Sequence, residues 1–332
     1  MPFVSSNDTL GANFKDRILN NNIKTTMGLR EWSILLLLSV IWGGSFFFIK
    51  IIVVHLPTLT VVASRVALAA IALWLYIALK RLPVPKSPQI WKAFMTMGIL
   101  NNIIPFTLIV WGQTEISSGL ASILNATTPL FTILVAGILL PDERANPRKL
   151  IGVLAGLTGV IVMIGPGALQ GLGMAVYAQL AILGAAFSYA LAGVYGRKFK
   201  ALAVDPVITA AGQVTISTVF LIPLAAMIDK PYTLAMPGLE VWASLIALAV
   251  ICTAFAYILY FQLLSTAGAT NLLLVTFLIP VSANFLGITF LGEKLLATQI
   301  IGMAFIGLGL MIIDGRAFKY TASHLQKVKN PD

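Results

Sequence analysis

The long uncharged apolar runs of this chain constrain its fold more than any other feature. They cover residues 93–114, 116–141, 150–196, 206–228, 241–292 and 295–313. A helix needs about 20 apolar residues to cross the roughly 30 Å hydrocarbon core of a bilayer. Each run reaches about that length, and 150–196 and 241–292 are long enough for two helices each. The expected breaks within these two runs are residues 165–173 and residues 265–268.

Two further apolar runs, 33–54 and 58–79, contain one basic residue each. The total is ten transmembrane helices, and the predicted fold class is an all-α integral membrane protein. The composition agrees, because 58% of the residues are hydrophobic and only 10% are charged. A soluble domain carries roughly 25% charged residues. This chain has too few of them to cover a water-exposed surface.

The sequence carries few groups suited to catalysis or metal binding. Cys252 is the one cysteine, and the two histidines, His55 and His324, fall in a short loop and in the C-terminal tail. No Cys/His cluster with metal-ligand spacing is present. No nucleophile, metalloprotease or phosphate-binding motif occurs in the structural context that it needs. We therefore predict no enzyme, no metal site and no cofactor.

The positions of Lys and Arg predict the orientation in the membrane. With the N-terminus inside, eighteen of the 22 basic residues fall in cytoplasmic segments, and Lys230 and Lys294 fall outside. Positive charge favours the cytoplasmic side, so we expect a multi-pass protein of the plasma (inner) membrane. Residues 1–31 and 316–332 are the predicted cytoplasmic tails. The net charge of +10 is thus a topology signal, and nucleic acid is not an expected partner.

The chain repeats itself weakly, with an offset of 147 to 150 residues. The matching pairs are Trp42 and Tyr189, Lys50 and Arg197, Arg65 and Gln213, Gln113 and Gln262, Glu143 and Glu293, Gly152 and Gly302, and Gly159 and Gly309. Two halves are predicted, at residues 32–167 and 168–315. Because five helices is an odd number, the second half enters the membrane from the opposite face. Inverted repeats of this kind commonly support alternating access.

Several short motifs carry a resemblance to a known family. They are residues 42–46 (WGGSF), Lys50, Arg65, residues 128–131 (TPLF), residues 142–144 (DER), residues 279–281 (IPV) and residues 291–294 (LGEK). With these motifs the chain resembles the drug/metabolite transporter superfamily, in particular its EamA-type permeases, over about residues 33–314. The resemblance implies ten helices, a central cavity between the halves, and export or exchange of amino acids, related metabolites or drugs.

Polar and aromatic residues within the predicted spans are candidates for lining that cavity. The candidates are Trp42, Phe46, Asn102, Phe106, Trp111, Gln113, Asn125, Tyr189, Tyr257 and Tyr260. Asn102, Phe106 and Gln113 share roughly one helical face, and amides in lipid need protein or substrate partners. The alternative for the amides is a bridge between helices, and for the aromatic rings it is ordinary packing.

Three further residues within spans are unusual for a membrane helix. Pro129 and Pro280 are each expected halfway along a helix, where proline frees the carbonyl four residues earlier. They predict either paired hinges at the cavity or kinks satisfied by neighbouring helices. Arg65 is the only ionisable residue deep in a span, so it predicts either an anion site or a structural bond to free carbonyls. No carboxylate lies at mid-span, so the sequence identifies no proton carrier.

We predict a secondary transporter that exports or exchanges small organic metabolites, such as amino acids, by alternating access. The alternatives are an efflux carrier for drugs or toxic compounds and a membrane protein that transports nothing. The expected partners are a small-molecule substrate and the lipid bilayer. Glycines such as Gly152 and Gly156 favour close helix packing. They allow this packing within one subunit or across a homodimer.

Overall fold

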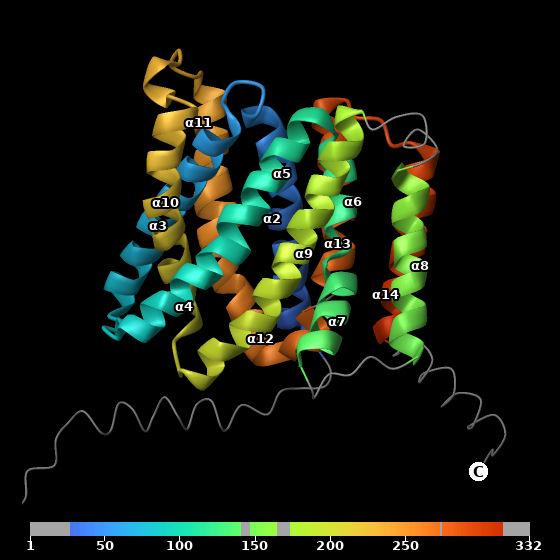
Figure 1. The fold of residues 1–332 in the computed structure, drawn as a ribbon, viewed down its shortest axis with the longest axis horizontal. Coiled ribbons are helices and arrows are strands. Elements are labelled where there is room, and N and C mark those ends of the chain that lie inside the picture. The colour runs from blue at the N-terminus through green and yellow to red at the C-terminus, as the bar shows by residue number, and fades with distance from the viewer. Residues whose placement is uncertain (1–26, 141–146, 165–172, 273, 315–332) are drawn as a thin grey trace, which may run out of the picture.

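The structure is a computed structural model that describes residues 27–140, 147–164, 173–272 and 274–314 (Figure 1). All regular secondary structure in these ranges is helical. The elements are α2 (Leu29–Ile52), α3 (Thr58–Lys80), α4 (Pro88–Gly98), η1 (Ile99–Ile103), α5 (Ile104–Glu115), α6 (Ser118–Asn125), α7 (Thr128–Leu139), α8 (Pro147–Ile164), α9 (Met174–Ala201), α10 (Pro206–Ile228), η3 (Pro231–Thr233), α11 (Leu239–Ile246), η4 (Ala247–Phe255), α12 (Ala256–Leu272), α13 (Val275–Leu291) and α14 (Ala297–Asp314).

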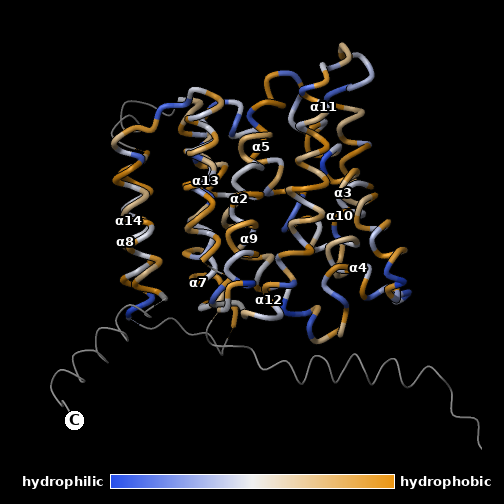
Figure 2. Tube along the Cα trace, turned by 180° about the vertical axis from the view of Figure 1, so that it is seen from behind, coloured by the Kyte–Doolittle hydropathy of each residue, from blue (hydrophilic) through white to orange (hydrophobic). Residues whose placement is uncertain are grey.

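Eight helical segments are long and apolar enough to cross a membrane. Three of them combine consecutive elements, namely α4 to α5, α6 to α7, and α11 to α12. The other two apolar helices, α13 and α14, are shorter. At 1.5 Å per residue a helix of 17 residues still extends about 25 Å. Ten membrane helices therefore fit the described chain. Figure 2 shows apolar residues along the helices and more polar residues toward their ends.

Helices distant in the sequence pack side by side in this bundle. α2 packs against α13, α3 against α10, α5 and α7 against α9, and α8 against α14. Each of these contacts joins an element before residue 168 to one after it. The two predicted halves are therefore closely interleaved, so a polar group in one half can find its partner in the other.

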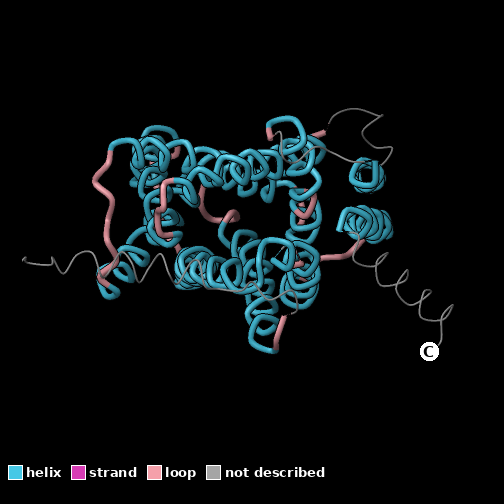
Figure 3. The backbone as a smooth tube through the Cα atoms, turned by 90° about the horizontal axis from the view of Figure 1, so that it is seen from below, coloured by secondary structure: helices cyan, strands magenta, loops and turns pink. Residues whose placement is uncertain are grey.

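The α8–α14 pair lies at one end of the bundle, beside the other helices (Figures 1 and 3). Glycines bring the two backbones together. A Cβ atom at Gly159 would lie 2.5 Å from the Gly302 carbonyl oxygen, and one at Gly302 would lie 2.7 Å from the Gly159 carbonyl oxygen. Gly152 and Gly309 oppose each other in the same way. These four glycines are thus used for packing within one chain.

Two boundaries differ from the sequence prediction. The predicted break at residues 265–268 is wrong, because α12 continues to Leu272. The hydroxyls of Ser265 and Thr266 donate to the Gln262 carbonyl, at 2.8 and 3.1 Å, so these residues bond back to the helix and do not end it. In addition, α2 begins at Leu29, and the last residues of the predicted tail 1–31 are helical.

The expected position of Pro280 was also wrong. Since α13 begins at Val275, Pro280 lies in the second turn of that helix and not halfway along it. The helix continues through Pro280 to Leu291. Pro129, by contrast, lies midway along the membrane segment Ser118–Leu139, as expected, in the first turn of α7 after the interruption between α6 and α7. The two prolines therefore occupy different positions in their helices.

The third and eighth membrane segments each contain a π-helical stretch, η1 and η4. A π turn places one more residue in the turn than an α turn does, and such turns are frequent at functional sites. Thr253 follows this wider spacing, because its Oγ1 donates to the carbonyl five residues earlier, at Leu248, at 2.8 Å. Each π segment buries a polar residue described next, Asn102 in η1 and Thr253 in η4.

Candidate functional site

Arg65 lies on α3 and is only 6% exposed. Its Nε donates a hydrogen bond to Oγ1 of Thr253 in η4, at 2.9 Å. Its guanidinium carbon lies 3.7 Å from the centre of the Phe106 ring, a cation–π distance. No described carboxylate forms an ion pair with it. Its described partners are thus a hydroxyl and a ring, and both interpretations of Arg65, the anion site and the structural bond to free carbonyls, stay predictions.

A hydrogen-bonded network of neutral side chains lies in the same core. The Tyr257 hydroxyl donates to Oδ1 of Asn102 and accepts from Nδ2 of Asn101, both at 3.1 Å. The Asn101 amide also donates to Oε1 of Gln213 at 3.1 Å. The Asn102 amide donates to the Ser217 hydroxyl at 3.3 Å. We call Arg65, Phe106, Thr253 and these five residues the Arg65 cluster.

The π segments position this cluster. η1 carries Asn101 and Asn102 on successive residues, and both reach second-half partners. The carbonyl of Leu100 in the same segment accepts from the Ser188 hydroxyl of α9 at 2.7 Å. η4 carries Thr253 and ends two residues before Tyr257. The wide turns therefore aim polar groups of both segments into the protein interior, where each finds a partner.

Aromatic rings extend from the cluster. Tyr257 stacks with Phe261, with ring centres 6.3 Å apart, and Phe261 meets Tyr260 edge-on at 5.1 Å. Tyr260 also contacts Trp42 of α2 at 5.6 Å. Tyr189 of α9 is half-buried, and its hydroxyl lies within electrostatic range of Arg65. The structure thus brings these predicted cavity residues into one region.

Phe46 and Gln113 make a different contact. Both are buried, and Nε2 of Gln113 donates to the Phe46 carbonyl at 2.8 Å, which ties α5 to α2. Lys50 lies in the last turn of α2, and its Nζ donates to the carbonyls of Gln113 and Ile116, at 2.9 and 3.0 Å. It therefore caps the C-terminal end of α5, where the helix dipole favours a cation.

Two predicted cavity residues have no described contact with the cluster. The half-buried Trp111 indole makes neither a hydrogen bond nor a ring contact within the described chain. Oδ1 of Asn125 is buried without a hydrogen-bond partner there. The main-chain carbonyl of Asn125, which Pro129 deprives of a donor, accepts from the Thr128 hydroxyl at 2.7 Å. The carbonyl that Pro129 leaves without a backbone donor is thus hydrogen-bonded by a neighbouring side chain.

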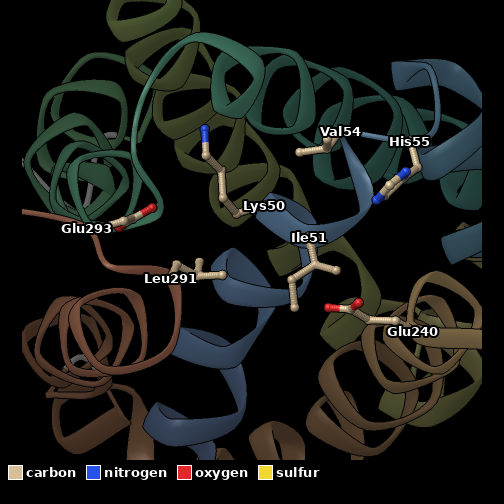
Figure 4. Close-up of a pocket in the computed structure, with 7 residues that line it drawn as sticks. All are labelled: Lys50, Ile51, Val54, His55, Glu240, Leu291 and Glu293. Atoms are coloured by element: carbon tan, nitrogen blue, oxygen red, sulfur yellow. The ribbon is translucent and has the colours of Figure 1, made fainter.

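One pocket opens at an end of the bundle, away from the cluster, with a volume of about 310 Å³. Figure 4 shows the residues that line it: Lys50 and Ile51 of α2, Val54 and His55 just after α2, Glu240 of α11, Leu291 at the end of α13, and Glu293 after α13. The Glu293 carboxylate is held by the first turn of α6. The central cavity itself stays a prediction.

Sequence reasoning missed several members of the cluster. Asn101 was not among the cavity candidates, and Gln213 was noted only as the repeat counterpart of Arg65. Ser217 and Thr253 were not selected at all. A signal was present, because Gln213 and Ser217 are four residues apart in an apolar helix, as are Thr253 and Tyr257. Polar residues at this spacing share a helix face, and that face turns inward.

No group of three or more His, Cys, Asp or Glu residues in the described chain could hold a metal ion. The fold and the cluster define a multi-pass helical membrane protein with a buried polar core. The chain belongs to the EamA-like transporter family, whose sequence model matches residues 30–165 and again residues 176–314. This family lies within the superfamily that the motifs predicted.

Named relatives agree with this family. The "Uncharacterized transporter YoaV" of Bacillus subtilis (strain 168) is 24% identical over 275 residues, with 82% of this chain and 93% of the relative covered. The "Probable amino-acid metabolite efflux pump" of Escherichia coli (strain K12) is 25% identical over 295 residues, with 86% and 95% covered. A crystal structure with 15% identity superimposes with a TM-score of 0.62 over 85% of this chain and 96% of that one, which supports the fold alone.

Proposed function

We propose that this protein is a secondary transporter that exports or exchanges amino acids or related small metabolites by alternating access. Its halves would be inverted repeats, and its termini would lie on the cytoplasmic side of the plasma (inner) membrane. The substrate class follows the relative named as a probable amino-acid metabolite efflux pump. The substrate would bind between the halves, beside the Arg65 cluster.

The observation that carries the proposal is the hydrogen-bonded network around Tyr257. It joins η1 of the first half to α10 and α12 of the second through amide and hydroxyl groups. A buried amide must keep a partner, but a substrate group can replace another side chain in that role. A network of this kind across two halves can therefore change partners when they separate.

The π segments support a symmetric arrangement of the halves. The offset between Gln113 and Gln262 carries η1, at residues 99–103, onto residues 248–252 of η4. Both segments thus place a non-α turn at equivalent depths of their repeats. Matched irregular helices at the centre are a feature of transporters built from inverted repeats.

Efflux from proteoliposomes tests the proposal. Purified protein is reconstituted with a mixed pool of labelled amino acids, nucleobases and cationic drugs, with and without a pH gradient. We expect selective efflux and counterflow of amino acids. Efflux of the cationic drugs alone would support the drug carrier instead. Absence of counterflow for every class, with protein shown to be folded, would contradict transport of these compounds.

A variant connects transport to the network. Tyr257→Phe removes the hydroxyl that joins Asn101 to Asn102, so we expect transport to fall at least about tenfold, the loss of about one hydrogen bond in rate terms. The matched control is Tyr232→Phe, because Tyr232 is 74% exposed in η3. Equal transport rates for the two variants would show that the network around Tyr257 is not needed for transport.

A further inference from the structure

Arg65 is a buried cation that lacks an anionic partner. Arginine stays protonated in proteins and carries five N–H donors. In the described chain its Nε donor is bonded to Thr253, and the donors on Nη1 and Nη2 have no hydrogen-bond acceptor. An unpaired buried charge is strongly unfavourable. Such a group is retained in a membrane segment when it has a task.

The helices around Arg65 contain no acid that could neutralise it. The uncharged runs 93–114, 150–196, 206–228 and 241–292 include α5 up to Thr114, most of α9, α10, η4 and α12. The last residue of α5, Glu115, lies about 14 Å along the helix from Phe106, at 1.5 Å per residue. The groups facing Arg65 are the Phe106 ring, the Thr253 hydroxyl, and Tyr189, Tyr257 and Cys252 within electrostatic range. A counter-charge must therefore come from outside these uncharged runs.

The guanidinium is also held by two contacts. Thr253 accepts from its Nε, and its central carbon lies 3.7 Å from the centre of the Phe106 ring. This leaves the edge formed by Nη1 and Nη2 with its donors unused. A rigid edge of parallel N–H groups matches the two oxygens of a carboxylate, and this pairing adds geometric specificity. A lysine at this position would present a point charge without that geometry.

We propose that Arg65 binds the carboxylate of the transported substrate and so selects carboxylate-bearing molecules. This inference rests on the proposed function and names the chemical group that the carrier recognises. The aromatic rings of Trp42, Tyr260 and Phe261 extend from the same region and suit an apolar side chain. The substrate class is then small carboxylates with an apolar part, which includes amino acids with large side chains.

Matched compounds test this assignment. L-phenylalanine, L-phenylalaninamide and phenethylamine share a ring and an amine, but only the first has a carboxylate. In the first measurement, each compound is added as a competitor to the counterflow of the substrate that the wild-type protein transports. In the second, each compound is added to detergent-solubilised protein, and the melting temperature of the protein is measured. We expect the acid to compete at a concentration at least about tenfold lower than the amide or the amine, as for a lost buried charge pair. Equal competition by all three would overturn the inference and leave transport standing.

Variants then test whether the preference for the acid depends on Arg65. Arg65→Gln should abolish the preference for the acid, and Arg65→Lys should retain part of it. Lys80→Gln, an exposed change at the end of α3, should retain the full preference. If Arg65→Gln keeps the preference, the assignment to Arg65 is wrong. If that variant does not fold, Arg65→Lys decides the assignment: a reduced preference for the acid supports it, and an undiminished preference overturns it.

A phosphate-bearing competitor separates the two kinds of anion. Phenyl phosphate carries the same ring with a different anionic group. Its match is phenylacetate, which has a ring and a carboxylate and likewise no amine. Weaker competition by phenyl phosphate than by phenylacetate supports the carboxylate, and stronger competition would overturn that choice. If the wild-type protein transports nothing in this pool, the proposed function fails. The acid's effect on the melting temperature of the wild type and of Arg65→Gln still tests the anion site by itself.

Discussion

Glu293 accepts hydrogen bonds from both the backbone N–H and the hydroxyl of Ser118, at 2.7 and 2.8 Å. The Gly119 N–H donates to the same carboxylate at 3.1 Å. Ser118 and Gly119 are the first residues of α6, where free N–H groups and the helix dipole favour an anion. A residue of the second predicted half therefore caps a broken helix of the first.

We expect Glu293→Gln to lower the stability of the protein, because it removes the charge from three hydrogen bonds. Bonds to a charged group contribute about 1.5–3 kcal/mol each, so a loss of about 1–3 kcal/mol is expected while the isosteric amide keeps part of the contact. The apparent melting temperature in detergent measures it. Glu240→Gln is the control, because Glu240 is exposed. Equal melting temperatures would contradict the prediction.

The α8–α14 contact depends on glycines whose Cβ positions are filled by backbone. A Cβ at Gly309 would lie 2.7 Å from the Gly156 nitrogen, while one at Gly307 would meet nothing within 4 Å. Gly309→Ala should therefore separate the helices and cost about 1–3 kcal/mol. Gly307→Ala, in the same helix, should be neutral. Crosslinking between cysteines introduced into α8 and α14, together with thermal unfolding, measures both variants. A tolerated Gly309→Ala would show that the backbones can separate freely.

The break between α6 and α7 is expected to depend on Thr128. Its hydroxyl is the donor to the Asn125 carbonyl, which has lost an N–H partner to Pro129. Thr128→Val leaves that carbonyl unsatisfied and should cost about 1–3 kcal/mol.

The control for this change is Thr158→Val in α8. The Thr158 hydroxyl likewise donates to a backbone carbonyl, that of Leu154, at 2.9 Å, but this carbonyl lies within a continuous helix and keeps its backbone donor. Thermal unfolding of the two variants should differ. A similar melting temperature for both would mean that another group satisfies the carbonyl at the break.

Lys50 is expected to stabilise the junction of α2 and α5. Lys50→Met keeps the apolar length of the side chain but leaves the carbonyls of Gln113 and Ile116 without their donor. We expect a loss of about 1–3 kcal/mol in thermal unfolding. Lys294→Met, at an exposed position, removes a charge without a described bond. If neither change alters the melting temperature, Lys50 does not stabilise the junction of α2 and α5.

The sequence by itself determined the helical class, the approximate spans and the family. These follow from local physics, because a bilayer fixes the length of an apolar helix and each helix satisfies its own backbone bonds. The same local reasoning selected Asn102, Tyr257 and Arg65, since a polar or charged residue in an apolar run needs a partner, and Phe106, because it shares a helical face with Asn102. It also predicted that the glycines of α8 and α14 pack closely.

Only the tertiary structure decided which partners these residues find. Arg65 meets Thr253 at a separation of 188 residues, and Asn102 meets Tyr257 at 155. Such pairings depend on helix rotation and on the π turns of η1 and η4, and neither leaves a mark on hydrophobic periodicity. For the same reason the sequence grouped Trp111 with the cluster and misplaced the start of α13. Helix formation is a local event, whereas the partner of a buried polar group is set by the packing of helices that lie far apart in the chain.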